Sequence, residues 1–317
     1  MTGLSILDLT PVRQGSDAAS ALRDTLALAQ LADSSGYHRY WLVEHHATAG
    51  VAGAATAVVI GHIAAHTKNI RVGAGGIMLP NHAPLIVAEQ FGTLAAFHPG
   101  RIDLGLGRGI ASDPATLQAL RRQPNDAAAF PSDVQELLAY FDGRGPVKAV
   151  PGEGADVPVW ILSSSLGGAQ LAAAMGLPYA FASHFAPDQL DVALAAYRGR
   201  FQPSARLQKP QVMLSLTAIV ADTDAEAQLL FSSAQHAGDG KLPPPVPDYL
   251  ASIAAERAAL IQRMFRHAAV GSPDTVARAL DAFRERYRPD EIIVTAQIHD
   301  VKARLKSFEM LAKIAAA

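Results

Sequence analysis

The chain has 317 residues, of which 50% are apolar and 18% carry a charged side chain, and this composition predicts a folded globular protein. Its 29 acidic and 27 basic side chains give a formal net charge of -2, which argues against nucleic acids and anionic membranes as partners. The absence of cysteine from the sequence excludes disulfides, thiolate metal sites and cysteine nucleophiles, and it is typical of a cytoplasmic protein.

The first residues show neither the basic stretch nor the apolar core of a signal peptide, so we expect none. The longest apolar run, at 51–65, is interrupted by Gly53, Gly61 and His62. It is also shorter than the roughly 18 residues that a membrane-spanning helix needs. We expect this run to be a buried helix.

Short β-rich runs alternate with longer Ala- and Leu-rich stretches in the first half of the chain. This alternation predicts a parallel sheet covered by helices. The expected strands lie at 4–9, 39–43, 70–73 and 102–106, and the expected helices lie at 17–35, 51–65, 85–97 and 131–141.

The same alternation continues in the second half. The expected strands lie at 158–162, 179–182, 212–220 and 291–295, and the expected helices between and after them lie at 168–175, 187–201, 224–234 and 301–315. Eight strands with eight helices predict an α/β fold of the (β/α)8 TIM-barrel type, as one domain over residues 1–317. A doubly wound sheet is the alternative, because counting strands does not show closure.

An insertion separates the seventh and eighth expected strands. It begins with a proline-rich stretch at 238–247 and continues with expected helices at 249–265 and 273–287. Long loops inside a compact domain are typical of functional or mobile segments. We therefore expect the segment 236–262 to form a mobile lid.

Polar or glycine-rich segments follow four of the expected strands. The active sites of barrel enzymes lie at the carboxyl ends of the strands, so these segments form the candidate site. The candidate residues are Glu44, His45 and His46 after the second strand, Gly75 and Gly76 after the third, Arg108 after the fourth, and Ser164, Ser165, Gly167 and Gly168 after the fifth.

His45 and His46 are candidates for acid–base catalysis, because imidazole titrates near neutral pH. They could also bind a metal ion. The sequence has no H-x-H or H-E-x-x-H motif, and the fourth strand ends without a carboxylate, at Arg108, which would repel a cation. We expect no metal.

Arg108 and the serine run are candidates for binding an anion. The run around Arg108 fails the dinucleotide motif G-x-G-x-x-G, because Ile110 stands at the third glycine position. The guanidinium of Arg108 can donate two parallel hydrogen bonds to a phosphate. Ser164 and Ser165 stand at an expected helix start, where hydroxyls and amides bind anions. A salt-bridged arginine and ordinary helix capping by serine are the alternatives.

Four blocks of sequence together resemble one family. They are YWLVEHH at 40–46, VGAGGIMLPNH at 72–82, AEQFGTL at 88–94 and PGRIDLGLGR at 99–108. In this order and spacing they resemble the bacterial luciferase-like flavin monooxygenases, and especially a bacterial subgroup of unassigned substrate. The resemblance continues through 158–165, 176–187 and 241–247, and covers nearly the whole chain.

The resemblance implies a barrel that binds reduced FMN, supplied by a separate flavin reductase, and uses dioxygen to oxygenate a small organic substrate. It implies that His45 acts in acid–base chemistry, with His46 as a less certain neighbour and Glu44 beside them at the cofactor. It implies that Arg108 holds the FMN phosphate, together with Ser164, Ser165 and the backbone near Gly167 and Gly168. A non-proline cis peptide between Gly75 and Gly76 would make room beneath the flavin ring. A homo-oligomer is expected.

The resemblance also leaves alternatives open. Some relatives use the deazaflavin F420 for hydride transfer without oxygen, and some proteins of this fold bind flavin without catalysis. True luciferases carry a reactive cysteine just before the phosphate arginine, where this chain has Gly107. Long-chain aldehyde bioluminescence is therefore not implied.

Overall fold

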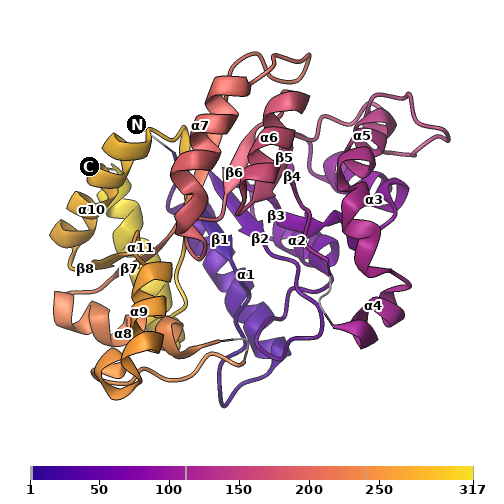
Figure 1. Cartoon of the computed structure of the whole chain (residues 1–317). Coiled ribbons are helices and arrows are strands. Elements are labelled where there is room, and N and C mark those ends of the chain that lie inside the picture. The colour runs from indigo at the N-terminus through magenta and orange to yellow at the C-terminus, as the bar shows by residue number, and fades with distance from the viewer. Residues whose placement is uncertain (1–2, 111–112, 239, 317) are drawn as a thin grey trace.

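Eight parallel strands close into a barrel in the computed structural model (Figure 1), which describes residues 3–110, 113–238 and 240–316. Neighbouring strands follow the order β6-β5-β4-β3-β2-β1-β9-β7, and pairing of β6 with β7 closes the ring. The barrel strands are β1 Gly3–Asp8, β2 Arg39–Leu42, β3 Arg71–Met78, β4 Ile102–Gly107, β5 Val159–Ser163, β6 Tyr179–Phe181, β7 Val212–Val220 and β9 Glu291–Thr295. The predicted (β/α)8 TIM barrel is confirmed, and the doubly wound alternative is wrong because that sheet has open edges.

Helices surround the barrel (Figure 1). They are α1 Ala18–Ser34, α2 Thr56–Ala65, α3 Pro84–Phe97, α4 Pro114–Leu120, α5 Phe130–Phe141, α6 Leu166–Met175, α7 Leu190–Arg200, α8 Asp224–His236, α9 Ala255–Met264, α10 Pro273–Tyr287 and α11 Val301–Ala316. Asp17 begins α1 by accepting a hydrogen bond from the amide of Ser20, and the four-residue spacing of Leu28 and Ala32 puts both on the buried face. Within the described ranges, no helix combines the length and apolar character needed to cross a bilayer.

The third strand is longer than the sequence predicts. Its glycines suggest a turn after residue 73, but β3 runs on to Met78 and pairs there with Gly107. Bare backbone makes this possible, since a Cβ atom on Gly105 would lie 2.3 Å from the carbonyl oxygen of Ala74. The peptide bond between Gly75 and Gly76 is cis, as the family resemblance implies. Both glycines therefore lie within β3 rather than after it.

Other predicted boundaries also change. The helix expected at 51–65 begins only at Thr56, and the helix expected at 249–265 divides into a 3-10 turn, Tyr249–Ser252, and α9. The sequence analysis missed α4 and a ninth strand, β8 Ala269–Gly271, which pairs with the distal end of β7 outside the barrel. A three-residue strand is too short to show an alternating pattern.

The proline-rich part of the insertion is attached to the loop after β1. The amide of Leu242 donates to the carbonyl of Val12 at 2.8 Å, and the amide of Gln14 donates to the carbonyl of Leu242 at 2.8 Å. The ammonium group of Lys241 donates to the carbonyl of Ser16. The insertion therefore lies beside the carboxyl end of β1; residue 239 lies outside the described residues. A lid at 236–262 stays a prediction.

Apolar side chains fill the inside of the barrel. They form a cluster separate from the larger core between strands and helices, and its buried members are Leu7, Trp41, Val43, Trp160, Ala180, Met213 and Ile293. The rings of Trp41 and Trp160 meet edge to face with their centroids 5.6 Å apart. The lumen is thus a packed core and not a channel.

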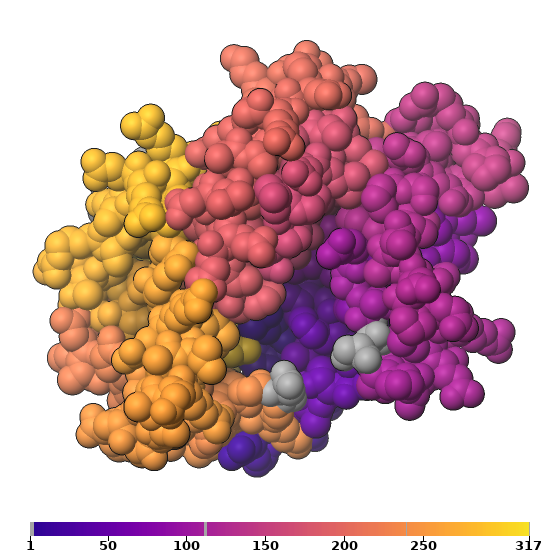
Figure 2. Space-filling model, viewed as in Figure 1, coloured from indigo at the N-terminus to yellow at the C-terminus, as the bar shows by residue number. Residues whose placement is uncertain are grey.

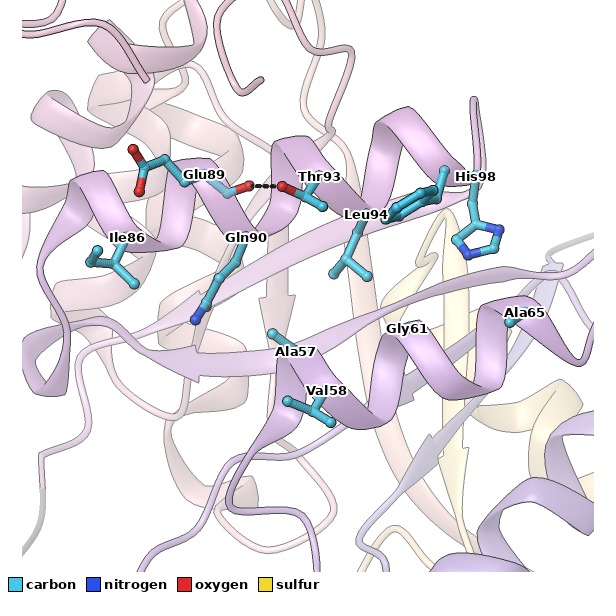
Figure 3. Close-up of a pocket in the computed structure, with 11 residues that line it drawn as sticks. Ala57, Val58, Gly61, Ala65, Ile86, Glu89, Gln90, Thr93, Leu94 and His98 are labelled. Carbon is cyan, nitrogen blue, oxygen red and sulfur yellow. Dashed lines mark hydrogen bonds between the residues drawn. The ribbon is translucent and has the colours of Figure 1, made fainter. Parts of the chain in front are cut away.

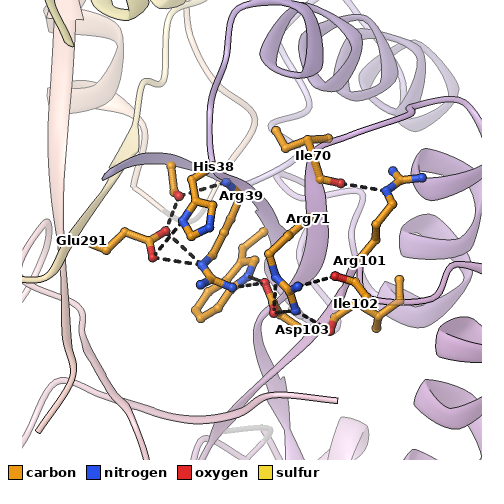
Figure 4. Close-up of polar contacts among 11 residues, drawn as sticks. His38, Arg39, Ile70, Arg71, Arg101, Ile102, Asp103 and Glu291 are labelled. Atoms are coloured by element: carbon orange, nitrogen blue, oxygen red, sulfur yellow. Dashed lines mark hydrogen bonds and ion pairs between the residues drawn. The ribbon is translucent and has the colours of Figure 1, made fainter. Parts of the chain in front are cut away.

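Buried charges close the other end of the lumen, where the strands begin (Figure 4). The Arg39 guanidinium on β2 contacts Asp103 on β4 at 2.6 Å and Glu291 on β9 at 3.0 Å, and Arg71 on β3 contacts Asp103 at 2.6 Å. Burial alone would raise the pKa of Glu291, but the hydrogen bond from His38 and the attraction of Arg39 hold that pKa below its usual value. One guanidinium thus links three strands across the barrel.

We expect Arg39→Ala to lower the free energy of unfolding by about 3–5 kcal/mol, because Asp103 and Glu291 lose the cation that they share inside the lumen. Urea denaturation of the purified chain measures this loss. Arg144→Ala is the matched control, since Arg144 is 75% exposed in its pair with Asp142 and exposed pairs contribute about 0–1 kcal/mol. Equal stability of the two variants would contradict the role given to Arg39.

Candidate active site

The candidate residues lie at the carboxyl end of the barrel, which we call the barrel mouth. Met78 of β3 pairs with Gly107 of β4, and Gly107 pairs with Leu162 of β5, so the segments that follow these strands are neighbours. Figure 2 shows the molecule hollowed between the orange helix α9 and the magenta helix α4, with indigo and violet residues of the early strands at the bottom. The strand ends therefore place the candidate residues around one hollow.

Glu44, directly after β2, organises one side of the barrel mouth. Its carboxylate is 1% exposed, and its Oε1 accepts hydrogen bonds from Nε2 of His46 at 2.6 Å and Nε2 of His82 at 2.7 Å. Its Oε2 accepts from the amide of Met78 at 2.9 Å. Burial would raise the pKa of Glu44, but these hydrogen bonds and the attraction of His82 hold it below its usual value.

Glu44, His46 and His82 also form a group of the kind that can hold a metal ion. Both imidazoles place Nε2 at hydrogen-bond distance from the same carboxylate oxygen. Since an ionised carboxylate only accepts, each Nε2 carries its hydrogen and donates, whereas a metal ligand would need the lone pair. The sequence analysis missed His82, although it ends the block 72–82.

A second histidine lies near His45. His45 is exposed and His46 is partly buried, while His184 follows β6 and hydrogen-bonds through Nδ1 to Ser215 at 2.6 Å. Burial, and to a smaller extent the charge of His45, lowers the pKa of His184 to about 4. His184 was missed because a lone histidine after a three-residue strand carries no motif.

Arg108 follows β4, with β2 and β3 between it and β1 around the barrel. Its side chain is exposed, and within the described part of the chain it makes no hydrogen bond or ion pair. It directly follows Gly107, the register partner of Leu162, so it stands beside Ser163 at the end of β5. The alternative of a salt-bridged arginine finds no support among the described residues.

At the start of α6, the amide of Leu166 donates to Oε1 of Gln189 at 3.1 Å, whereas the amides of Gly167 and Gly168 are open among the described residues. Ser165 occupies the N-cap position, but its hydroxyl makes no capping hydrogen bond. The alternative of ordinary helix capping by Ser165 is therefore not supported. A Cβ atom on Gly168 would lie 2.2 Å from Oγ of Ser163, whereas a Cβ on Gly167 would meet nothing within 4 Å. Gly168 thus allows close packing, and Gly167 leaves open space at a helix N-terminus, where anions bind. Ser164 is partly buried in the same turn.

Gly75 and Gly76 pack closely against the neighbouring strands. A Cβ atom on Gly75 would lie 2.7 Å from Leu7 and 3.0 Å from the Trp41 ring, and a Cβ on Gly76 would lie 2.7 Å from the carbonyl of Gly105. Neither position has room for a Cβ atom, so glycine lets β3 pack against β1, β2 and β4 here.

Comparisons with known proteins agree with this geometry. A family profile described as luciferase-like monooxygenase matches residues 2–288. The chain belongs to this family. A protein of Escherichia coli strain K12 named luciferase-like monooxygenase is 49% identical, over 96% of this chain and 95% of the relative. The crystal structure of apo-MsnO8 is 34% identical, covers 100% of this chain and 99% of its own, and has a TM-score of 0.88.

Two more distant structures share the fold. One is the oxygenating constituent of 3,6-diketocamphane monooxygenase of Pseudomonas putida in complex with FMN, at 18% identity and TM-score 0.71, covering 100% of this chain and 98% of its own. The other is an F420-dependent secondary alcohol dehydrogenase with an F420-acetone adduct, at 16% identity and TM-score 0.72, covering 99% and 98%. The chain is therefore a flavin-dependent oxidoreductase in the broad sense that includes deazaflavin F420.

We expect Glu44→Gln to lower the free energy of unfolding at pH 7 by about 2 kcal/mol, since hydrogen bonds to charged groups contribute about 1.5–3 kcal/mol. The folded pKa lies below the usual value of 4.5. The contribution of the carboxylate is therefore complete above that value and is lost as the pH falls through the folded pKa.

Urea denaturation of both proteins at a series of pH values measures this effect. The stability difference between them should be greatest near neutral pH and should shrink below about pH 4.5. Glu285→Gln, at an exposed position of α10, is the control and should show no such difference. A constant difference at all pH values would contradict the assigned hydrogen bonds.

Proposed function

We propose that the protein is a monooxygenase that binds reduced FMN and uses dioxygen to oxygenate a small organic substrate. One observation carries this proposal: Arg108, which has no partner among the described residues, stands beside the start of α6, at the same barrel mouth as four histidines. A cation next to open amides recognises a phosphate. Imidazoles supply the acid–base groups that oxygen chemistry requires.

The residues present fit FMN. Arg108, the hydroxyls of Ser164 and Ser165, and the amides of Gly167 and Gly168 would hold its phosphate, and the backbone of β3 would support its ring. Bound reduced FMN supplies the electrons that activate dioxygen. The space beside Gly167, which a Cβ would enter without meeting another atom, supports this placement.

The chain's own residues then control protons and water. His45, which is exposed beside the barrel mouth, would exchange protons at the reacting atoms. Glu44 would act through His46 and His82, because its carboxylate already accepts three hydrogen bonds from the protein. The segment 236–262 would close over the site and exclude water, since activated oxygen is otherwise lost to solvent as peroxide.

The proposal includes partners and a location. The reduced FMN would come from a separate flavin reductase, and the enzyme would work in the cytoplasm. An F420-dependent hydride transfer is the second candidate, because an F420 enzyme shares this fold. Anaerobic turnover with F420 would favour it, and flavin binding without oxygen consumption would favour a non-catalytic flavin-binding protein.

An apolar surface on the outer helices supports a homodimer. Val58 of α2 is 73% exposed, and Ile86 and Phe97 of α3 are 46% and 74% exposed. Figure 3 shows Val58 and Ile86 along the groove between the two helices. Exposed apolar patches mark protein interfaces, so we propose that a second copy of the chain covers this face.

We expect Arg108→Ala to weaken binding of reduced FMN by at least about tenfold, because a charge-assisted bidentate contact to phosphate contributes about 1.5–3 kcal/mol. Anaerobic titration followed by absorbance measures the affinity. The thermal unfolding temperature should stay unchanged, since Arg108 makes no contact that stabilises the described fold.

Arg144→Ala, which removes an exposed arginine elsewhere, should bind reduced FMN like the unmodified chain. Riboflavin, which lacks the phosphate, should bind equally to the Arg108 variant and the unmodified protein. If the Arg108 variant keeps full affinity for reduced FMN, the phosphate assignment is wrong.

We expect Val58→Glu to convert the dimer into monomers, because each partner would bury an unpaired carboxylate in an apolar contact. Sedimentation velocity at several protein concentrations measures the oligomeric state. Val147→Glu, at a position that is 54% exposed outside these helices, is the control and should leave the dimer intact. A monomeric unmodified chain would contradict the proposed interface.

A further inference from the structure

His184 is attached firmly to the neighbouring strand. Its Nδ1 lies 2.6 Å from Oγ of Ser215 on β7, and its backbone amide donates to the same oxygen at 3.4 Å. The hydroxyl of Ser183 donates to the carbonyl of Ser215. Side chain and backbone together therefore fix the orientation of the imidazole at the end of β6.

The same contacts determine which ring nitrogen carries the hydrogen. The hydroxyl of Ser215 donates its single hydrogen to the carbonyl of Phe181 at 3.0 Å. Its oxygen can then only accept from His184, so Nδ1 carries the hydrogen. The lone pair of the neutral ring lies on Nε2, which has no hydrogen-bond partner in the described ranges of the chain.

His45 belongs to the opposite side of the barrel mouth. It follows β2, and in the closed barrel three strands separate β2 from β6 in either direction. His45 is nevertheless close enough for its charge to disfavour a proton on His184. It is the one ionisable side chain in the described structure with a marked electrostatic effect on His184.

The two imidazoles have different environments. His45 is exposed to solvent, whereas His184 is partly buried and its pKa is lowered to about 4. Burial disfavours the imidazolium, so His184 is uncharged at neutral pH and its Nε2 can accept a proton.

We propose that His184 is the general base of the barrel mouth, accepting a proton through Nε2 while His45 supplies one from the opposite side. This inference rests on the proposed function. Without a substrate, the two electrons and two protons of bound reduced FMN would pass to dioxygen and give hydrogen peroxide. His184 would take one proton from a ring nitrogen, whose N–H bonding electrons would pass to oxygen. His45 would give one proton to the reduced oxygen, the other ring proton would reach it through water, and His184 would then return its proton to His45.

The first experiment needs no flavin. Nitrogen-15 NMR of the full chain, labelled at histidine, reports the protonation of each ring nitrogen. The expected result is a neutral His184 at pH 7 with hydrogen on Nδ1, and loss of that preference in Ser215→Ala. In His45→Ala, the pKa of His184 should rise. A His184 that is protonated at pH 7, or carries its hydrogen on Nε2, would overturn the proposal.

The second experiment measures peroxide release from reduced FMN and dioxygen. His184→Ala should bind reduced FMN like the unmodified chain but release peroxide about 100-fold more slowly, since a general base contributes about 10²–10⁴-fold. Added imidazole should restore the rate in His184→Ala, where the space is open, and not in His184→Gln, where a side chain fills it. His66→Ala, on the exposed end of α2, is the control histidine and should change nothing.

The outcomes separate the two hypotheses. If the unmodified chain does not bind reduced FMN, the proposed function fails, and NMR still decides the state of His184. If the chain binds reduced FMN but His184→Ala or His184→Gln keeps the full rate, only the inference fails. Loss of rate without rescue by imidazole also overturns it, because a structural role would explain that result.

Discussion

The guanidinium of Arg39 determines how the lower half of the barrel is held together. It lies inside the lumen and contacts carboxylates from β4 and β9, while its own strand pairs with β1 and β3. A closed barrel needs every strand at a fixed tilt and stagger. A buried cation that links strands across the ring opposes any slip between them, and so fixes where each strand ends at the barrel mouth.

The buried charges of the lumen lie away from the candidate site. The charges of Arg39, Asp103 and Glu291 fill the end where the strands begin, two tryptophans fill the middle, and the candidate site residues follow the opposite ends. A second buried pair, Arg304 with Asp8 at 2.6 Å, lies at the carboxyl end of β1 and holds the last helix there. The barrel mouth thus has stabilising buried charges of its own, while its exposed loop residues can vary with substrate.

The alternation of strands and helices was enough to predict the βα units of the barrel, because each unit has its own local pattern, whereas only the pairing of β6 with β7 shows that the sheet closes. The prediction that β3 ends at residue 73 was wrong. A run of glycines is typical of a turn, but here it allows close contact between β3 and β4. Glu44, His45 and Arg108 were predicted as site residues because each lies shortly after the end of a strand. His82 and His184 were missed because their partners, Glu44 and Ser215, are distant in sequence and only the closed ring brings them together.

Both tryptophans of the chain lie in the lumen, with their rings 5.6 Å apart. The intrinsic fluorescence of the protein therefore comes from one location, directly below the Gly75–Gly76 peptide. A flavin absorbs light at the wavelengths that tryptophan emits, so a flavin seated on that peptide would quench this emission by energy transfer. The unlabelled protein thus contains its own optical reporter for the occupancy of the barrel mouth.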